Sequence, residues 1–179
     1  MIFKLLTEIR PLSNHKVLYD SYTHATHVMS ILSNRTNNKA LILAGLLHEV
    51  KPRLGEYKFK KCLEIIENTA PYHSNLPQIT HLLEAFSETN GKSKETLAID
   101  VLSRGDSNVE LLFLADTLSQ VELLHSTIAL NSIKQLVTSL INKELIDEED
   151  DLVIKINEVI NHKLIHHKHG SQTSKARKT

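Results

Sequence analysis

The chain has 179 residues, a length that suits one domain, and 41% of them are apolar, which is enough to bury a hydrophobic core. The chain has 21 basic residues (Lys and Arg) and 21 acidic residues (Asp and Glu). There is thus no excess of basic residues that would indicate a nucleic-acid or membrane partner. Five glycines, four prolines and only 4% aromatic residues favour helices over a sandwich or barrel. The composition therefore predicts an all-α protein that binds neither nucleic acid nor membrane.

Two further features bear on location and domain organisation. The first residues, MIFKLLTEIR, are too short an apolar stretch for a signal peptide or a membrane span. Cys62 is the single cysteine, which excludes an intramolecular disulfide and fits a reducing compartment, so we expect a cytoplasmic protein. We predict a single domain over 1–168, followed at 169–179 by a disordered basic tail, because those last residues include no acid and are rich in Lys, Ser and Thr.

In chain order, apolar periodicity first predicts a helical region over 13–32 with a possible break near Thr23. After the turn NRTNN, residues 40–50 are apolar at nearly every position, which indicates a helix buried on all sides. Pro52 and Gly55 are expected to end that helix.

The second half of the chain also has helical patterns. Residues 59–66 form an amphipathic stripe, and residues 108–124 form a second strongly apolar helix. Shorter amphipathic segments lie between and after them, and a last helix is expected over 152–165. We see no internal repeat and no second domain.

Acidic and histidine side chains occur inside the two most apolar helices. Asp116 follows five apolar residues in LLFLADTLSQ, and His48 and Glu49 close the helix over 40–50. A buried carboxylate needs a partner. If the two helices cross, one imidazole and two carboxylates meet in the core, where a divalent cation would neutralise them. Such a mixed nitrogen and oxygen site suits Mn, Fe, Zn or Ni better than Ca or Mg.

A fourth ligand is available from His24 or His27, and the residues alone do not choose between them. With 11 histidines and 21 acids in the chain, about one histidine–acid neighbour pair is expected by chance. The occurrence of the His48–Glu49 pair is therefore no evidence for a metal site. Its position at the end of an apolar helix is the feature that favours one. For Asp116 the simpler alternative is a side chain that faces solvent or pairs with a lysine.

Three segments, in this order, resemble the motifs of one family. HATHVMSIL at 24–32, LAGLLHEV at 43–50 and DSNVELLFLADTLSQ at 106–120 resemble the HPxxVAxIL, AALLHDV and DxRVxxxKLADRLHN motifs of the RelA/SpoT-type HD domain. This domain is the hydrolase module for guanosine tetra- and pentaphosphate alarmones. The resemblance covers about residues 22–124 and implies an all-α HD-domain helical bundle.

The resemblance implies a metal site as well as a fold. Its ligands would be His24, His48, Glu49 and Asp116, and the ion would be Mn²⁺, with Fe, Zn and Ni as alternatives. The implied function is that of a metal-dependent phosphohydrolase similar to the small alarmone hydrolases, which are about this long. Its substrate would be a nucleotide or a related phosphate ester.

The chain departs from the family where catalysis is expected. Pro52 and Arg53 stand in place of an acidic pair thought to assist hydrolysis, and Glu56, one helical turn further on, is the candidate that could replace it in proton transfer. Lys51, Arg53 and Gln120 are the candidate phosphate or base contacts.

These departures keep two other functions open. The first is a degenerate, non-catalytic HD domain that binds a nucleotide or a protein partner, which the loss of the acidic pair favours. Phe113 and Thr117, which replace the family's Lys and Arg, argue against alarmone specificity. The second is a helical interaction domain in which Asp116 and Glu49 are satisfied by Lys or Arg. Bound metal would separate the first from the second.

Overall fold

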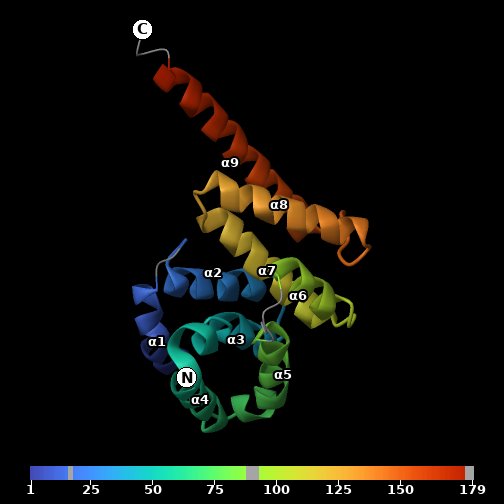
Figure 1. Ribbon diagram of the computed structural model, residues 1–179. Helices are drawn as coiled ribbons and strands as arrows, with labels where there is room; N and C mark the ends of the chain where they lie inside the picture. The colour runs from blue at the N-terminus through green and yellow to red at the C-terminus, as the bar shows by residue number, and fades with distance from the viewer. Residues whose placement is uncertain (16–17, 88–92, 176–179) are drawn as a thin grey trace.

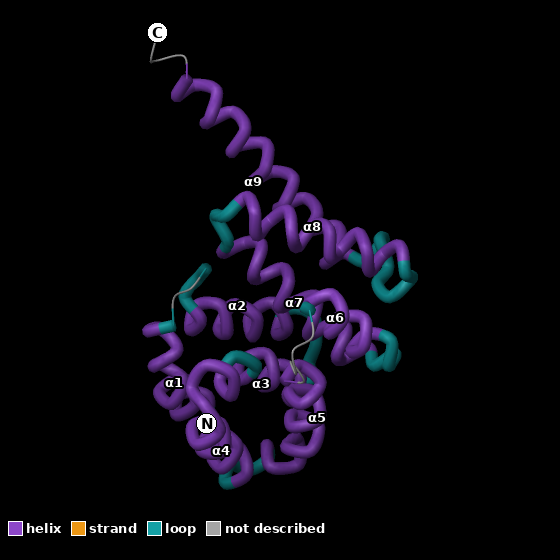
Figure 2. Tube along the Cα trace, viewed as in Figure 1, coloured by secondary structure: helices purple, strands orange, loops and turns teal. Residues whose placement is uncertain are grey.

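The computed structural model describes residues 1–15, 18–87 and 93–175, and the side chains of all of these except 86–87 and 167–175. This part of the chain is helical and contains no β-strand, so the predicted all-α bundle is confirmed (Figures 1 and 2). Short 3₁₀ turns at Arg10–Asn14 and Tyr72–Asn75 accompany the α-helices. The helices are α1 (Ile2–Ile9), α2 (Ser21–Ser33), α3 (Lys39–Leu47), α4 (Val50–Glu67), α5 (Leu76–Ser87), α6 (Lys94–Leu102), α7 (Ser107–Leu123), α8 (Thr127–Asn142) and α9 (Asp151–Lys175).

The buried side chains form two hydrophobic cores. The first core lies mainly among α1 to α5, and the second among α6 to α9. Figure 1 shows these two groups of helices with α7 running between them. Leu112 and Ala115 on α7 pack into the first core, whereas Leu114 and Leu118 pack into the second. Helix α7 is therefore apolar on all sides because it serves both cores.

Helices α2 and α3 pack closely against each other, and α2 also packs against α7. A Cβ atom added at Gly45 would lie 2.5 Å from Leu32 Cδ1 and 3.2 Å from Val28 Cγ1. Glycine at this position therefore lets the two helices approach, because any side chain would meet the core of α2.

The predicted helix over 40–50 is divided in the structure. Helix α3 ends at Leu47, His48 and Glu49 form the junction, and α4 begins at Val50. Pro52 does not end a helix here, because it lies in the first turn of α4, where a backbone N–H has no helical partner to lose. Gly55, at φ +83°, interrupts the helical path within α4. The expected end of the helix was therefore wrong by several residues.

Other boundaries also differ from the sequence pattern. The first long helix, α2, begins at Ser21 instead of breaking near Thr23. Helix α9 runs to Lys175, so residues 169–175 are helical where the sequence predicts a disordered tail. The remaining tail residues, 176–179, lie outside the described residues. Among the helices that the structure describes, none combines the length and the apolar composition that a membrane span requires.

Side-chain caps fix the start of three helices that matter below. Asp20 accepts the backbone N–H of Thr23 at the start of α2 (2.7 Å). Asn38 accepts two backbone N–H groups at the start of α3 (3.1 and 3.3 Å), and Asp106 does so at the start of α7 (2.9 and 3.4 Å). These bonds satisfy amide groups that the helix itself leaves free.

The cap of α7 gives a pH-dependent prediction. Burial alone would raise the pKa of Asp106, but the backbone N–H of Asn108 and the imidazole of His81 hold this pKa below its usual range. The stabilisation is therefore present above the ordinary carboxyl pKa of about 4 and is lost as the pH falls through the lower folded value. Between pH 6 and about pH 3, urea unfolding should show the wild type losing about 1 kcal/mol more stability than Asp106→Asn, which caps without titrating. Parallel losses would contradict this role.

Candidate metal centre

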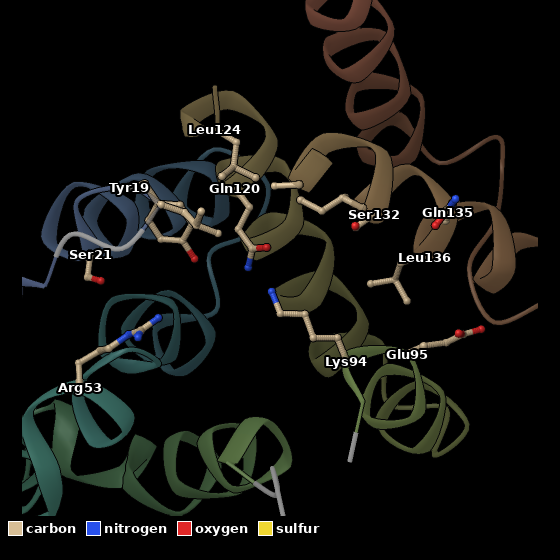
Figure 3. Close-up of a pocket in the computed structure, with 13 residues that line it drawn as sticks. Tyr19, Ser21, Arg53, Lys94, Glu95, Gln120, Leu124, Ser132, Gln135 and Leu136 are labelled. Atoms are coloured by element: carbon tan, nitrogen blue, oxygen red, sulfur yellow. The ribbon is translucent and has the colours of Figure 1, made fainter. Parts of the chain in front are cut away.

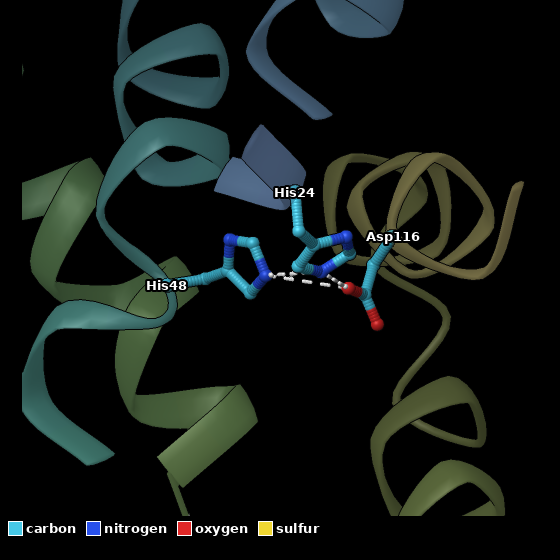
Figure 4. A group of neighbouring side chains, drawn as sticks. All are labelled: His24, His48 and Asp116. Atoms are coloured by element: carbon cyan, nitrogen blue, oxygen red, sulfur yellow. Dashed lines mark hydrogen bonds and ion pairs between the residues drawn. The ribbon is translucent and has the colours of Figure 1, made fainter. Parts of the chain in front are cut away.

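Three polar side chains from distant parts of the sequence meet where α2, α3 and α7 come together (Figure 4). His24 lies in the first turn of α2, His48 follows the last residue of α3, and Asp116 lies in the middle of α7. His24 is fully buried, and the side chains of His48 and Asp116 are only 6% and 14% exposed. The predicted crossing of the two apolar helices therefore brings a histidine and a carboxylate together.

The ligand-type atoms of this cluster point at one another. Nε2 of His24 lies 2.8 Å from Oδ1 of Asp116, and Nε2 of His48 lies 3.2 Å from the same oxygen. The two Nε2 atoms are 3.1 Å apart. One atom from each residue thus falls in a group whose members all lie within 4.8 Å of one another.

The tautomer of His48 follows from its other nitrogen. Nδ1 of His48 lies 2.7 Å from the backbone carbonyl oxygen of Gly45. Because a carbonyl oxygen can only accept, Nδ1 carries a hydrogen and donates it. In the neutral ring Nε2 is then a lone-pair acceptor directed at the Asp116 carboxylate, which is also an acceptor. This contact is favourable only with a positive charge, either a proton on Nε2 or a metal ion beside it.

His24 is oriented in a similar way by a buried hydroxyl group. Nδ1 of His24 lies 2.8 Å from Oγ of Ser119, and this hydroxyl can donate to the backbone carbonyl of His24 at 3.5 Å. In that arrangement Nδ1 donates to Ser119, and Nε2 of His24 offers its lone pair to the cluster. Metal-binding histidines in proteins are commonly fixed through the second ring nitrogen in this manner.

The electrostatics of the cluster favour a charged carboxylate. Burial alone would raise the pKa of Asp116, but the imidazoles of His24 and His48 keep this pKa far below its usual range. Burial alone would lower the pKa of His48, but the Asp116 carboxylate outweighs it and raises that pKa. Gln120 donates to the second carboxylate oxygen at 2.7 Å. Asp116 therefore remains an anion and needs a positively charged partner, either a protonated histidine or a metal ion.

This donor set fits a divalent transition metal. Mn, Fe, Zn and Ni all accept two imidazole nitrogens and one carboxylate oxygen as ligands. A metal ion held by these three ligands would keep further coordination positions for water or substrate. The second nitrogen of each ring is already engaged, so both histidines are directed at the same point. His24, His48 and Asp116 could therefore hold an ion with little rearrangement.

Glu49, the fourth ligand expected from the resemblance, lies at the edge of this cluster. Oε1 of Glu49 is 3.9 Å from Nε2 of His48, and Oε2 forms an ion pair with Nε of Arg53 at 2.7 Å. Glu49 is not among the residues whose ligand atoms all lie within 4.8 Å of one another. Its role as a metal ligand stays a prediction.

His27, the alternative to His24, faces a different set of partners. Nε2 of His27 pairs with Oε2 of Glu122 at 3.2 Å, and Nδ1 lies 3.2 Å from Oγ of Ser119. Both ring nitrogens of His27 therefore have partners outside the cluster, and the geometry selects His24.

The other candidate residues lie around the cluster. Lys51 and Glu56 form an ion pair at 3.2 Å, and the Glu56 side chain is 52% exposed. Gln120 donates from its amide nitrogen to Asp116, so this side chain already contacts the cluster. Neither Glu56 nor Lys51 belongs to the group of converging ligand atoms.

Two adjoining cavities open beside the cluster. The first, about 580 Å³, is lined by His48, Glu49, Asp116 and the basic residues Lys51, Arg53 and Lys60, and we refer to it as the His48 cavity. The second, about 530 Å³, is lined partly by apolar residues of α8 and its neighbours, and we refer to it as the α8 cavity (Figure 3). The two cavities share four lining residues, Tyr19, Arg53, Lys94 and Gln120.

Sequence reasoning missed three of the residues that shape this site. Ser119 orients His24, Tyr19 stacks near it with ring centroids 4.6 Å apart, and Lys94 lines both cavities. Ser119 could have been found as a polar residue one turn after Asp116 in an apolar helix. Tyr19 and Lys94 give no such signal, because only the tertiary fold brings them to the site.

The contact between Ser119 and His24 gives a prediction on stability. Ser119→Ala leaves a buried imidazole nitrogen without its partner, so the free energy of unfolding should fall by about 1–3 kcal/mol. The matched control is Ser33→Ala, which removes an exposed hydroxyl bonded only to the carbonyl of Ser30 and should change stability by less than about 0.5 kcal/mol. Denaturant unfolding measures both, and equal values would contradict the orienting role.

Comparison of the chain with known protein families, with curated proteins and with solved structures finds no match. The residues themselves must therefore carry any assignment of function. The features that do so are the three converging ligand atoms of His24, His48 and Asp116 and the two cavities beside them.

Proposed function

We propose that the protein is a metal-dependent phosphohydrolase that acts on a nucleotide or a related phosphate ester, in the manner of the small alarmone hydrolases that its motifs resemble. The observation that carries the proposal is the convergence of His24, His48 and Asp116 on one point. The adjoining His48 cavity has both basic and acidic side chains in its lining, the basic ones being Lys51, Arg53, Lys60 and Lys94. The three converging residues come from the three segments that carry the resemblance. Independent of the resemblance, their donor atoms fit a catalytic ion.

The ion would be Mn²⁺, with Fe, Zn and Ni as alternatives. When bound, a divalent ion at such a site acidifies water and neutralises charge on a phosphate group. The side chains that would hold it are His24, His48 and Asp116, whose ligand atoms converge on one point. The hydrogen bonds that Nδ1 of His48 donates to the Gly45 carbonyl and Nδ1 of His24 donates to the Ser119 hydroxyl would keep the two unprotonated Nε2 atoms directed at the ion.

The cavities suit a substrate with a phosphate group and an apolar part. Arg53 and Lys94 line both cavities and can bind phosphate oxygens through charge-assisted hydrogen bonds. The α8 cavity adds apolar side chains, among them Leu124 and Leu136, together with the Gln120 amide. A nucleoside or another flat organic group would have both apolar contact and a hydrogen-bonding partner there.

Proton transfer is assigned to Glu56. Its carboxylate lines the His48 cavity and is solvent-accessible, which leaves it able to exchange protons with water. Lys51, its ion-pair partner at 3.2 Å, would release it when a phosphate group occupies the lysine.

A non-catalytic HD-like domain that binds a nucleotide or a protein partner is the second candidate. The observation that favours it is the pairing of two acids that line the His48 cavity: Glu56 with Lys51 and Glu49 with Arg53. A site whose acids are neutralised in this way retains a pocket for an anionic ligand but lacks a general base.

Metal binding can be tested through stability. After removal of ions with EDTA, saturating Mn²⁺ should raise the melting temperature by about 5–10 °C, because a ligand that binds only the folded state stabilises it. His24→Ala should abolish this shift, and the neighbouring His27→Ala should retain most of it, since its ring faces Glu122 instead. Equal shifts in the two variants, or none in the wild type, would count against the metal site.

Catalysis can be tested by incubating the Mn²⁺-loaded protein with guanosine tetraphosphate and a panel of nucleotides. Released phosphate and pyrophosphate are followed, and Asp116→Ala is the control that should reduce turnover to background. Turnover of any substrate that disappears in this variant supports the hydrolase. Silence across the panel, with metal still bound, would favour the non-catalytic alternative.

A further inference from the structure

Glu49 and Arg53 form the closest ion pair at the mouth of the site. Nε of Arg53 lies 2.7 Å from Oε2 of Glu49, and the Glu49 side chain is only 12% exposed. A carboxylate with so little access to water needs a cationic partner, and Arg53 supplies it without any metal ion. The charge of Glu49 is thus already neutralised.

The position of Glu49 relative to the cluster agrees with this pairing. His24, His48 and Asp116 bring their ligand atoms within 4.8 Å of one another, whereas Glu49 stays outside that group. Its nearer oxygen is 3.9 Å from His48 Nε2, and its other oxygen is directed at Arg53. In the present geometry three ligand atoms converge, and none of them belongs to Glu49.

The bond to Glu49 leaves most of the Arg53 guanidinium available. Arginine has five N–H donors, and only the one on Nε is used by Glu49, so the two terminal nitrogens can bind another anion. Arg53 lines both the His48 cavity and the α8 cavity. Glu49 therefore holds a partly free cation where the two cavities adjoin.

Lys94 reaches the same place from another helix. It lines both cavities and carries its ammonium group in from the first turn of α6, across from Arg53 on α4, with the Gln120 amide between them (Figure 3). Two cations and an amide on opposite walls of one space form a complementary environment for a phosphate group.

The backbone around Arg53 explains why this side chain needs Glu49 to hold it in place. Gly55, with φ +83° and ψ 173°, separates the first turn of α4, which carries Arg53, from the remainder of the helix. A long side chain on such a short turn has much rotamer freedom, and a bond to a buried carboxylate removes it.

We propose that Glu49 positions Arg53 for anion binding and is not a metal ligand, and that Arg53 and Lys94 together bind a phosphate group of the substrate. The inference rests on the proposed function for the nature of the substrate, but its anion site can be measured without metal. In this proposal the metal centre has three protein ligands, whereas the resemblance implies four. Arg53 and Lys94 bind phosphate, whereas the family has an acidic pair at the positions of Pro52 and Arg53.

The rival role for Glu49 is the fourth metal ligand that the resemblance implies. The two roles predict opposite effects of Glu49→Gln, which keeps the size of the side chain and removes its charge. A ligand role requires loss of metal affinity, whereas a positioning role requires loss of anion affinity with the metal site intact.

The experiment measures two affinities for each variant of the full chain. Mn²⁺ binding is followed by equilibrium dialysis, and pyrophosphate binding to the metal-free protein is followed by calorimetry in EDTA. The variants are Glu49→Gln, Arg53→Met and Lys94→Met. Arg35→Met is the matched control, because Arg35 pairs with Asp151 on the surface and lies outside both cavities. Far-ultraviolet circular dichroism confirms that each variant is folded.

We expect each of the three variants to weaken pyrophosphate binding by about tenfold or more, the usual effect of losing a charge-assisted hydrogen bond. Mn²⁺ affinity should change by less than about threefold in all of them, and Arg35→Met should match the wild type. Loss of Mn²⁺ binding in Glu49→Gln with unchanged pyrophosphate binding would overturn the proposal, and so would a wild type that does not bind pyrophosphate. Absence of Mn²⁺ binding from every protein, with the pyrophosphate losses as expected, would overturn the metal-dependent function and leave the anion site standing.

Discussion

The arrangement of the central helices depends on one buried negative charge, the carboxylate of Asp116 in the middle of α7. An uncompensated anion in a hydrophobic core costs several kcal/mol or more. Here Gln120 donates to one carboxylate oxygen, and the other faces Nε2 of His24 and of His48, where a proton or a metal ion supplies the positive charge. Because the two histidines come from α2 and from the end of α3, compensating this charge requires those elements to meet α7 in one particular register.

The polar groups that stabilise the Asp116 charge extend from the centre of the bundle towards its surface. The histidine rings are oriented by the backbone carbonyl of Gly45 and the buried hydroxyl of Ser119. Beyond them, Glu49 and Arg53 form the rim where the core opens into the cavities. Each polar group is thus paired with the next, from the centre of the bundle to solvent, which is how proteins keep an ionic site inside an apolar interior.

The sequence predicts the fold class and the centre of this site because both depend on local patterns. All-apolar stretches identified α3 and α7, and a lone acid within α7 indicated that Asp116 needs a partner. In the outer part of the site, Lys51, Arg53, Glu56 and Gln120 were named from the sequence and line the His48 cavity. The helix break between Leu47 and Val50 and the pairing of Glu49 with Arg53 could not be predicted, since they depend on how α4 turns away. Lys94 was missed for the same reason: its place beside Arg53 results from the packing of α6, which no spacing in the sequence records.

The side chains of the cluster belong to helices that pack into different hydrophobic cores. Asp116 belongs to α7, the helix that packs into both cores, whereas His48 follows α3, which packs into the first core only. A displacement of α7 relative to α3 would therefore change the separation of these two side chains. Because the contacts between them are close to 3 Å, a displacement of a fraction of that length is enough to break or restore the cluster. Whether the three side chains stay in contact therefore depends on how α7 packs against α3.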